Sequence, residues 1–269
     1  MQSGDFRYFT PRKNKYLCQK NKMNVLGIIP ARYGSTRLEG KPLLDICGKP
    51  MIQRVYEQAK KALDFVLIAT DDKRIEAEVL RFGGNVVMTS KQHSTGTNRC
   101  LEAFEIFSRN SVIKFDVILN IQGDEPLLEP EQIKALVSCF KQKGTKMATL
   151  VIPATEQKEL DSGVFVVFDK NSNALYFSRS VIPFVRDEKF ENWIAKNTFY
   201  KHVGMYGFSP KALHAFANLA ETSLENSEKL EQLRWLENGN QIKVAITKHQ
   251  SIPVDTLEDI EKVRKIIGG

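Results

Sequence analysis

The chain has 269 residues, of which 42% are hydrophobic and 26% are charged; these ordinary values exclude a collagen, a low-complexity chain and a charge-rich disordered polymer. The formal net charge is +7, but residues 1–22 hold six bases and one acid, so they carry +5 and leave +2 for the rest. A nucleic-acid-binding protein, which needs a basic folded face, is therefore disfavoured. No apolar run approaches the roughly 18 residues that span a bilayer, and no secretory signal is recognisable.

The four cysteines stand far apart in the sequence, and none belongs to a CxxC pair. The four histidines are scattered as well, without the HExxH spacing of a zinc site. These wide spacings disfavour a disulfide framework and a zinc site, and they indicate reduced thiols. We therefore expect a cytoplasmic protein.

Residues 1–22 show no apolar periodicity, which predicts a disordered basic tail. An apolar strand over 24–29 follows Met23, which we interpret as the functional start of the chain. The elements predicted next are a helix over 50–63, a strand over 65–69, a helix over 73–82, a strand over 86–88, a helix around Phe104, a strand over 115–121 and a helix over 130–141. This alternation predicts an α/β fold, with a doubly wound sheet and helices on both of its faces.

The alternation breaks down after about residue 145. The elements predicted there are strands over 147–152, 163–169, 174–178 and 200–208, helices over 210–219 and 227–238, a strand over 242–247 and a helix over 257–267. Thr256 and Asp259 have the spacing of a capping box for the last helix. We interpret the middle part as a mixed-strand insertion, serving as a substrate lid or a dimer arm. The body is then one domain over 23–269, with halves over 23–145 and 146–269.

The segment 29–42, IPARYGSTRLEGKP, has the richest chemistry in the chain. It follows the first strand, and open α/β sheets bind ligands at the carboxyl ends of their strands. Backbone N–H groups at its glycines, together with Arg32, Arg37 and Lys41, suit a polyphosphate. The glycine spacing and the proline after Lys41 exclude both a P-loop and a GxGxxG motif. A solvated basic loop is the less favoured alternative.

Two segments offer acidic residues to such a loop. Asp124 follows the buried strand in NIQGDEP, where its carboxylate can hold a hard divalent cation that bridges phosphate oxygens. The alternative is that Asp124 or Glu125 only caps a turn, but the neighbouring basic loop favours a metal site. Asp255 lies in PVDTLED, and its local context favours ordinary chemistry at a helix N-terminus.

Two further polar turns have two equally supported interpretations. Thr70 and Asp71 follow the second strand, and Gly96 and Arg99 lie in the turn HSTGTNR that opens a helix. These residues either contact a nucleotide or cap the helices that follow them.

Several motifs occur together in one order: IPARYGSTRLEGKPL at 29–43, NIQGDEP at 120–126, ALYFSR at 174–179, YKHVGMYGF at 200–208, EKLEQLR at 228–234 and VDTLED at 254–259. In them the chain from Met23 to about Ile267 resembles the 3-deoxy-D-manno-octulosonate (Kdo) cytidylyltransferases, or CMP-Kdo synthetases. The resemblance implies a nucleotide-diphospho-sugar transferase fold and a homodimer. It also implies that CMP is transferred from CTP to the anomeric hydroxyl of Kdo, with release of pyrophosphate, for lipopolysaccharide biosynthesis.

The resemblance also implies roles for individual residues. Its magnesium carboxylates are Asp124 and Asp255, which with Arg37 and Lys41 form the catalytic set, so that the local interpretation of Asp255 is reversed. The resemblance assigns the CTP phosphate loop to Arg32, Ser35, Arg37 and Lys41. To these we add, as expected nucleotide contacts, Ala31 and the polar-turn residues Thr70, Asp71, Gly96 and Arg99. The sugar site in the second half comprises Gln122, Arg179, Arg186, His202, Tyr206, Glu231 and Gln232.

Four residues depart from the family pattern: Glu39, Thr95, Asn98 and Phe165. Glu39 adds a negative charge beside the phosphate loop, and Phe165 stands where a lysine is usual. These departures leave two alternatives to Kdo activation. One is CTP-dependent activation of a related ulosonic acid, such as 8-amino-Kdo or a sialic acid, and the other is a weakly catalytic nucleotide-sugar-binding protein. We expect Mg²⁺ as the cofactor and no membrane partner.

Overall fold

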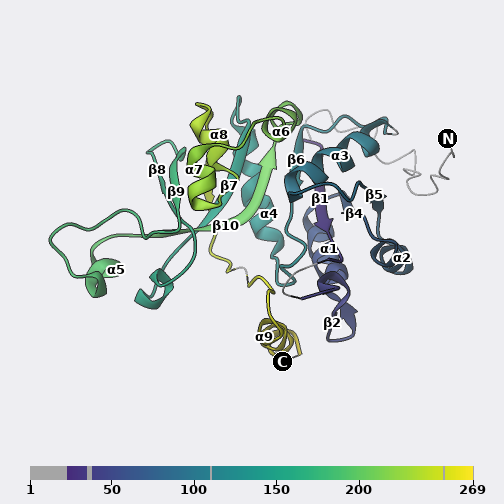
Figure 1. Ribbon diagram of the computed structural model, residues 1–269, viewed down its shortest axis with the longest axis horizontal. Coiled ribbons are helices and arrows are strands. Elements are labelled where there is room, and N and C mark those ends of the chain that lie inside the picture. The colour runs from purple at the N-terminus through teal and green to yellow at the C-terminus, as the bar shows by residue number, and fades with distance from the viewer. Residues whose placement is uncertain (1–22, 35–37, 110, 251, 269) are drawn as a thin grey trace.

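A computed structural model of the chain describes residues 23–34, 38–109, 111–250 and 252–268 (Figure 1). The predicted tail over 1–22 and the loop residues Ser35 and Arg37 lie outside the described residues. In the part of the chain that is described, no helix is both long enough and apolar enough to cross a bilayer.

The centre of the molecule is one mixed sheet with the strand order β11-β7-β10-β6-β1-β4-β5. Its strands are β1 (Val25–Ala31), β4 (Phe65–Thr70), β5 (Val86–Met88), β6 (Val117–Asn120), β7 (Met147–Pro153), β10 (Tyr200–Phe208) and β11 (Lys243–Ile246). All neighbours pair in parallel except β10, which runs antiparallel between β6 and β7. Strands β1 and β4 are buried almost throughout, as expected for strands covered on both faces.

Helices cover both faces of the sheet and enclose two apolar cores, which confirms the doubly wound fold (Figure 1). On one face, α1 (Met51–Ala62), α2 (Lys73–Arg81) and α4 (Pro130–Ser138) contribute buried side chains such as Val55, Ile75 and Ile133. The other face is covered by α3 (Gly96–Arg109) and α6 (Pro210–Ala217), through Phe104 and Phe216 among others.

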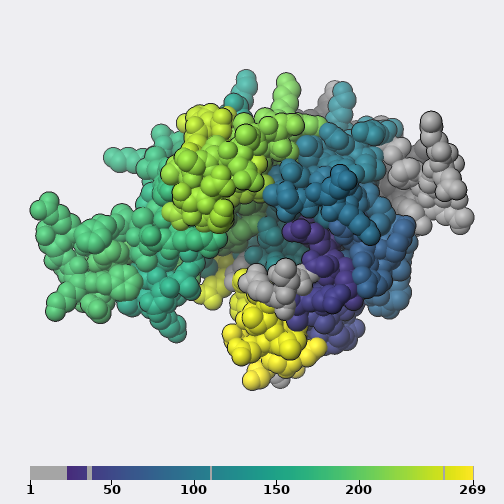
Figure 2. All heavy atoms as spheres, viewed as in Figure 1, coloured from purple at the N-terminus to yellow at the C-terminus, as the bar shows by residue number. Residues whose placement is uncertain are grey.

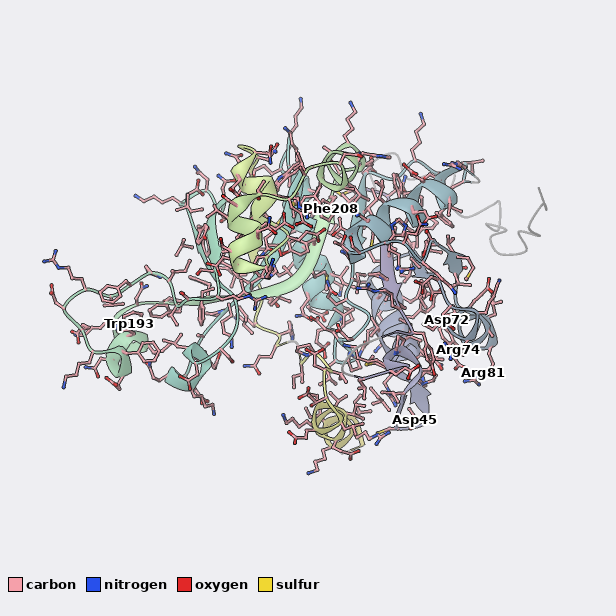
Figure 3. All side chains as sticks on the ribbon, in the orientation of Figure 1. Asp45, Asp72, Arg74, Arg81, Trp193 and Phe208 are labelled. Carbon is pink, nitrogen blue, oxygen red and sulfur yellow. The ribbon has the colours of Figure 1, made fainter. Side chains whose placement is uncertain are left out.

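An arm projects from the body between β7 and β10 (Figure 1). It contains β8 (Phe165–Phe168), β9 (Ala174–Ser178), three single-turn helices, η3 (Gln157–Leu160), η4 (Phe190–Asn192) and α5 (Trp193–Lys196), and the connecting loops. Trp193 lies in the outer part of the arm (Figure 3), where it stacks on Phe199 in a small separate core. The two strands were predicted, whereas the short helices were not, because a single turn leaves no apolar periodicity.

The single helix predicted over 227–238 is wrong. The structure has two helices there, α7 (Ser223–Glu228) and α8 (Leu233–Glu237). Lys229 between them adopts a left-handed conformation with φ of 52°, which ends the first helix. A buried ion pair between Arg234 and Glu225, with Arg234 Nε donating to Glu225 Oε2 at 2.6 Å, holds the two helices together.

The C-terminal helix α9 (Leu257–Gly268) packs on the segment that follows the first strand (Figure 2). That segment contains η1 (Lys41–Leu43), β2 (Asp45–Ile46) and β3 (Lys49–Pro50). Ile46, Val254 and Val263 share a small apolar core there. The predicted capping box is confirmed, because Thr256 Oγ1 accepts from Asp259 N at 3.2 Å and Asp259 Oδ2 accepts from Thr256 N at 3.0 Å. The chain's last segment is thereby fixed beside the first loop.

Candidate active site

Three residues that are far apart in the sequence meet beyond the carboxyl ends of the parallel strands. Lys41 Nζ donates to Asp124 Oδ2 at 2.7 Å and to Asp255 Oδ1 at 3.2 Å. It also donates to the backbone oxygen of Val254 at 2.7 Å, while Val254 N donates to the backbone oxygen of Asp124 at 2.9 Å. The backbone therefore fixes the separation of the two carboxylates, and the Lys41 ammonium contacts both of them.

This arrangement fits a divalent cation as well as an ammonium group. Two carboxylate oxygens that both contact one nitrogen can also contact one metal ion, and Mg²⁺ prefers oxygen ligands. Among the described residues, no group of three or more Asp, Glu, His or Cys side chains could hold a metal ion. A metal bound by only two protein carboxylates takes its remaining ligands from water and substrate phosphates, which is usual for Mg²⁺.

The described ends of the phosphate loop are joined by contacts that the sequence reasoning missed. Gly40 N donates to the backbone oxygen of Tyr33 at 2.9 Å, and Gly40 has a φ of 67°. The guanidinium carbon of Arg74 lies 3.2 Å from the centre of the Tyr33 ring, and Arg74 also pairs with Asp72 (Figure 3). Tyr33 was visible in the motif, but no local pattern links it to α2.

The nucleotide residues predicted from the polar turns occupy different environments. Arg32 is exposed, whereas Ala31 and Thr70 are buried at the ends of β1 and β4. Arg99 is only 1% exposed, and its guanidinium donates to Asp71 at 2.7 Å and to Thr89 Oγ1 at 2.6 Å. In this structure Arg99 therefore ties α3 to the end of β4.

Gly96 begins α3 in close contact with β1. A Cβ atom at this position would lie 3.5 Å from the ring of Pro30. This is an ordinary van der Waals distance, so the backbone of Gly96 lies next to β1 without a steric need for glycine. The N-terminus of α3 is therefore beside the end of β1.

The rings of His202 and Tyr206, both predicted for the sugar site, lie together because strand β10 is irregular. In a regular strand, residues four apart are separated by roughly 13 Å, whereas these two ring centres are 5.2 Å apart. Strand β10 is irregular here, because Val203 and Tyr206 pair with the adjacent residues Leu150 and Thr149 of β7. The irregularity brings the two rings into contact on one face of the sheet.

Glu231 and Gln232 follow the break between α7 and α8. Thr97 Oγ1, at the start of α3, donates to Glu231 Oε2 at 2.8 Å, and burial raises the pKa of the Glu231 carboxyl. Burial also raises the pKa of Tyr206, with a smaller contribution from Glu231, so that the phenol stays protonated at neutral pH. Gln232 is buried, and its Nε2 has no hydrogen-bond partner among the described residues. Four side chains predicted for the sugar site thus form a polar wall, here called the sugar wall, beside the N-terminus of α3: His202, Tyr206, Glu231 and Gln122, whose Nε2 donates to the backbone oxygen of Gly204 at 2.8 Å.

The two arginines predicted for the sugar site lie on the arm, apart from each other. Arg179 Nε donates to the backbone oxygen of Glu228 at 2.7 Å, which places Arg179 beside the break between α7 and α8. Arg186 is 89% exposed, and its ion pair with neighbouring Asp187 is long, at 3.6 Å. Within one chain, the structure therefore places Arg179 near the Glu231 wall and leaves Arg186 in solvent.

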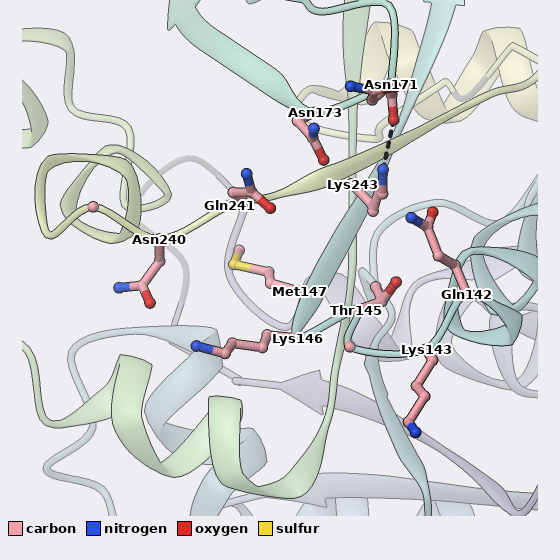
Figure 4. Close-up of a pocket in the computed structure, with 12 residues that line it drawn as sticks. Gln142, Lys143, Thr145, Lys146, Met147, Asn171, Asn173, Asn240, Gln241 and Lys243 are labelled. Atoms are coloured by element: carbon pink, nitrogen blue, oxygen red, sulfur yellow. Dashed lines mark hydrogen bonds between the residues drawn. The ribbon is translucent and has the colours of Figure 1, made fainter.

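A cavity of about 550 Å³ lies elsewhere and is separate from this site (Figure 4). It is lined by Lys146, Asn173 and Lys243, among others, at the start of β7 and β11. Both strands run in the direction of β1, so the cavity lies at the amino ends of the strands, opposite Asp124. The cavity is therefore on the opposite edge of the sheet from Lys41, Asp124 and Asp255 and is not part of the candidate active site.

The environment of His202 predicts how stability depends on pH. Burial lowers the pKa of His202 from 6.5 to about 4. Between these values the unfolded chain binds the proton more readily than the folded chain, so the free energy of unfolding falls as the pH is lowered from 6.5 to 4. We expect a loss on the order of 1–3 kcal/mol from this residue, measured by denaturant unfolding at several pH values.

His202→Gln should make this pH dependence shallower by the same amount. His214→Gln is the matched control, because the side chain of His214 is 45% exposed. An unchanged slope in His202→Gln would contradict the assignment.

Comparison with known proteins identifies the family to which this site belongs. The model of the cytidylyltransferase family matches residues 26–243. A 3-deoxy-manno-octulosonate cytidylyltransferase from Parabacteroides distasonis is 52% identical over 89% of this chain and 96% of its own, and one from Fusobacterium nucleatum is 49% identical over 90% and 96%. A solved CMP:2-keto-3-deoxy-manno-octonic acid synthetase, complexed with CTP, superimposes with a TM-score of 0.83 at 38% identity, covering 91% of this chain and 98% of its own.

The chain therefore belongs to the cytidylyltransferase family of nucleotidyltransferases. Within that family, the relatives described above carry the name 3-deoxy-manno-octulosonate cytidylyltransferase, so the resemblance drawn from the motifs is confirmed. The nucleotide-diphospho-sugar transferase fold is confirmed as well.

Proposed function

We propose that this chain transfers CMP from CTP to the anomeric hydroxyl of Kdo and releases pyrophosphate. The observation that carries the proposal is the group of Lys41, Asp124 and Asp255 at the strand ends, in a chain whose relatives are named for this reaction. A cytoplasmic location and a role in lipopolysaccharide biosynthesis accompany the proposal.

The reaction is an in-line displacement at the α-phosphorus of CTP. The anomeric oxygen of the sugar forms a bond to this phosphorus, the bond to the bridging oxygen breaks, and pyrophosphate leaves with the electron pair. The proton of the sugar hydroxyl is released to solvent. Phosphoryl-type transfers of this kind depend on positioning and charge neutralisation rather than on a covalent enzyme intermediate.

The residues of the site supply these two functions. Lys41, with Arg37 from the part of the loop outside the described residues, neutralises the departing pyrophosphate. Asp124 and Asp255 would hold Mg²⁺, which as a Lewis acid makes the α-phosphate more electrophilic. Their placement by backbone hydrogen bonds keeps both carboxylates in position before substrate binds.

The sugar is bound by the wall that contains His202, Tyr206, Glu231 and Gln122. Kdo is an acidic sugar with several hydroxyls, so its pocket needs cations and mixed hydrogen-bond partners. Arg179 lies beside this wall and can offer a bidentate contact to the carboxylate. The assignment of Gln232 rests on its buried amide nitrogen, which has no partner among the described residues.

We further propose that two copies pair through the arm. Phe184 is 74% exposed and Phe190 is 39% exposed, and both lie on this projection. Large apolar side chains exposed together on an arm are typical of an interaction surface. In such a homodimer, Arg186 of the arm could reach the sugar site of the other copy.

A pyrophosphate-release assay over a small panel of substrates tests the proposed reaction. CTP, UTP, ATP and GTP are each combined with Kdo, 8-amino-Kdo and a sialic acid in the presence of Mg²⁺. We expect release with CTP and Kdo. Faster pyrophosphate release with another acidic sugar would identify that sugar, rather than Kdo, as the substrate. Binding of CTP without release of pyrophosphate would favour a nucleotide-sugar-binding protein.

Arg186→Ala tests the contribution of the arm to sugar binding. Loss of one charged contact costs about 1.5–3 kcal/mol, so we expect the KM for the sugar to rise roughly tenfold to a hundredfold while the KM for CTP changes little. The measurement is steady-state kinetics with each substrate varied in turn. Lys189→Ala, another exposed cation of the arm, is the control. A rise in the KM for CTP alone would show that the arm does not serve the sugar.

A further inference from the structure

The irregularity in β10 allows side chains beside the sugar wall to bond three backbone carbonyls, those of Val203, Gly204 and Met205. Because Val203 and Tyr206 pair with adjacent residues of β7, the intervening Gly204 and Met205 have no partner on that strand. Side chains bind the carbonyls instead: Gln122 Nε2 donates to Gly204 O at 2.8 Å, and Thr149 Oγ1 lies 2.9 Å from Met205 O and 3.4 Å from Val203 O. The irregularity is thus a built feature whose shape depends on two polar side chains.

Thr149 lies fully buried on β7 and also contacts the imidazole of His202. Its Oγ1 is 2.9 Å from His202 Nε2. A hydroxyl has one proton to donate, and a carbonyl oxygen can only accept. If Thr149 donates its hydroxyl proton to Met205 O, it has no proton left for His202. The contact with His202 is then a hydrogen bond only if Nε2 carries the ring proton and donates it to Thr149 Oγ1. Only this arrangement makes both contacts of the Thr149 hydroxyl, with Met205 O and with His202 Nε2, hydrogen bonds.

The protonation state of His202 determines which of its ring nitrogens can accept a hydrogen bond. With its pKa lowered to about 4, the imidazole is neutral at pH 7 and carries one ring proton. If that proton is on Nε2, then Nδ1 carries a lone pair. The ring is held in place by edge contact with Phe177, at 5.3 Å between ring centres, and by contact with Tyr206.

We propose that Thr149 is a positioning residue, which fixes His202 in the Nε2–H tautomer so that Nδ1 accepts a hydrogen bond from a hydroxyl of the sugar. This inference rests on the proposed function for the identity of the hydroxyl donor. The tautomer itself is a property of the protein without substrate.

The tautomer can be observed directly by NMR. In the full chain labelled with ¹⁵N in histidine, two-bond ¹⁵N–¹H correlations show which ring nitrogen carries the proton, and His202→Gln identifies the signals. We expect Nε2–H in the wild type and in Thr149→Ser, which keeps the hydroxyl. Thr149→Val has nearly the same shape but no acceptor, and we expect it to lose this tautomer.

Kinetics provide the second measurement. Thr149→Val should raise the KM for the sugar roughly tenfold and leave the KM for CTP unchanged, while Thr149→Ser should stay near the wild type. Thr247→Val is the matched control, because Thr247 is also buried and lies outside the sugar wall. If Thr149→Val does not fold, the wild-type tautomer still tests the inference, because a proton on Nδ1 would overturn it.

Two results would overturn the inference: a wild-type His202 protonated on Nδ1, or an Nε2–H tautomer that persists in Thr149→Val. Failure of the proposed function looks different. In that case the wild type would show the Nε2–H tautomer and Thr149→Val would not, but the wild type would release no pyrophosphate with Kdo.

Discussion

Asp124→Asn and Asp255→Asn are each expected to lower turnover by on the order of 10²-fold or more and to leave the fold intact. Asparagine keeps the shape of the side chain but removes the anionic oxygen, so both the metal site and the position of Lys41 are weakened. The cost to folding is small because the two side chains are 28% and 34% exposed, and partly exposed ion pairs contribute little. Turnover at saturating substrates and Mg²⁺, together with the denaturant midpoint, measures both effects.

Asp161→Asn is a suitable control, because Asp161 is an exposed carboxylate on the arm. Direct binding of Mn²⁺, followed by electron paramagnetic resonance, separates loss of metal from loss of turnover. Near-normal magnesium-dependent turnover in either variant would refute the assignment of these carboxylates.

The fold could be predicted where one strong periodicity governs a long segment. Helix α1 and strand β4 lie within a residue or two of their predicted bounds, because continuous apolar runs and 3.6-residue stripes dominate there. The break at Lys229 could not be predicted, since both flanking segments fit a single helical pattern. The break depends on tertiary contacts, including those that Glu228 makes with Ser178 and Arg179.

The site was predicted in part, and Asp255 shows why local reasoning has a limit. On its own, the segment PVDTLED suggested that Asp255 serves the N-terminus of the following helix. In the structure Asp259 has that role, since its carboxylate accepts from the backbone N–H groups of Asp255 and Thr256. The Asp255 carboxylate is therefore available to Lys41, 214 positions earlier in the chain. Only the family resemblance assigned Asp255 to the active site, and no local pattern encodes its contact with Lys41.

The irregularity in β10 marks the same limit at the sugar wall. A regular strand would place His202 and Tyr206 on one face but would separate their rings too far for contact. The register that joins them depends on how β10 pairs with β7, which the sequence of neither strand reveals alone.

Lys41→Met is expected to change turnover and metal affinity in opposite directions. Turnover should fall by on the order of 10²-fold, because no cation remains at position 41 to neutralise the departing pyrophosphate. Mn²⁺ binding in the absence of nucleotide should become tighter. In the structure the Lys41 ammonium already neutralises Asp124 and Asp255, so a metal ion must compete with it. Methionine has a similar length but carries no charge, so it removes this competing ammonium group from the two carboxylates.

Lys41→Arg keeps the positive charge but changes the shape of the side chain, so it distinguishes the effect of the charge from the effect of the shape. We expect its Mn²⁺ affinity to stay near that of the wild type, whereas its turnover should fall because the guanidinium cannot reproduce the compact ammonium contact. Lys49→Met, which breaks a largely exposed ion pair with Glu57, controls for loss of a lysine near the loop. Titration of each nucleotide-free variant with Mn²⁺ measures the affinities. If Lys41→Met bound Mn²⁺ no more tightly than the wild type, Lys41 would not be competing with the metal for the two aspartates.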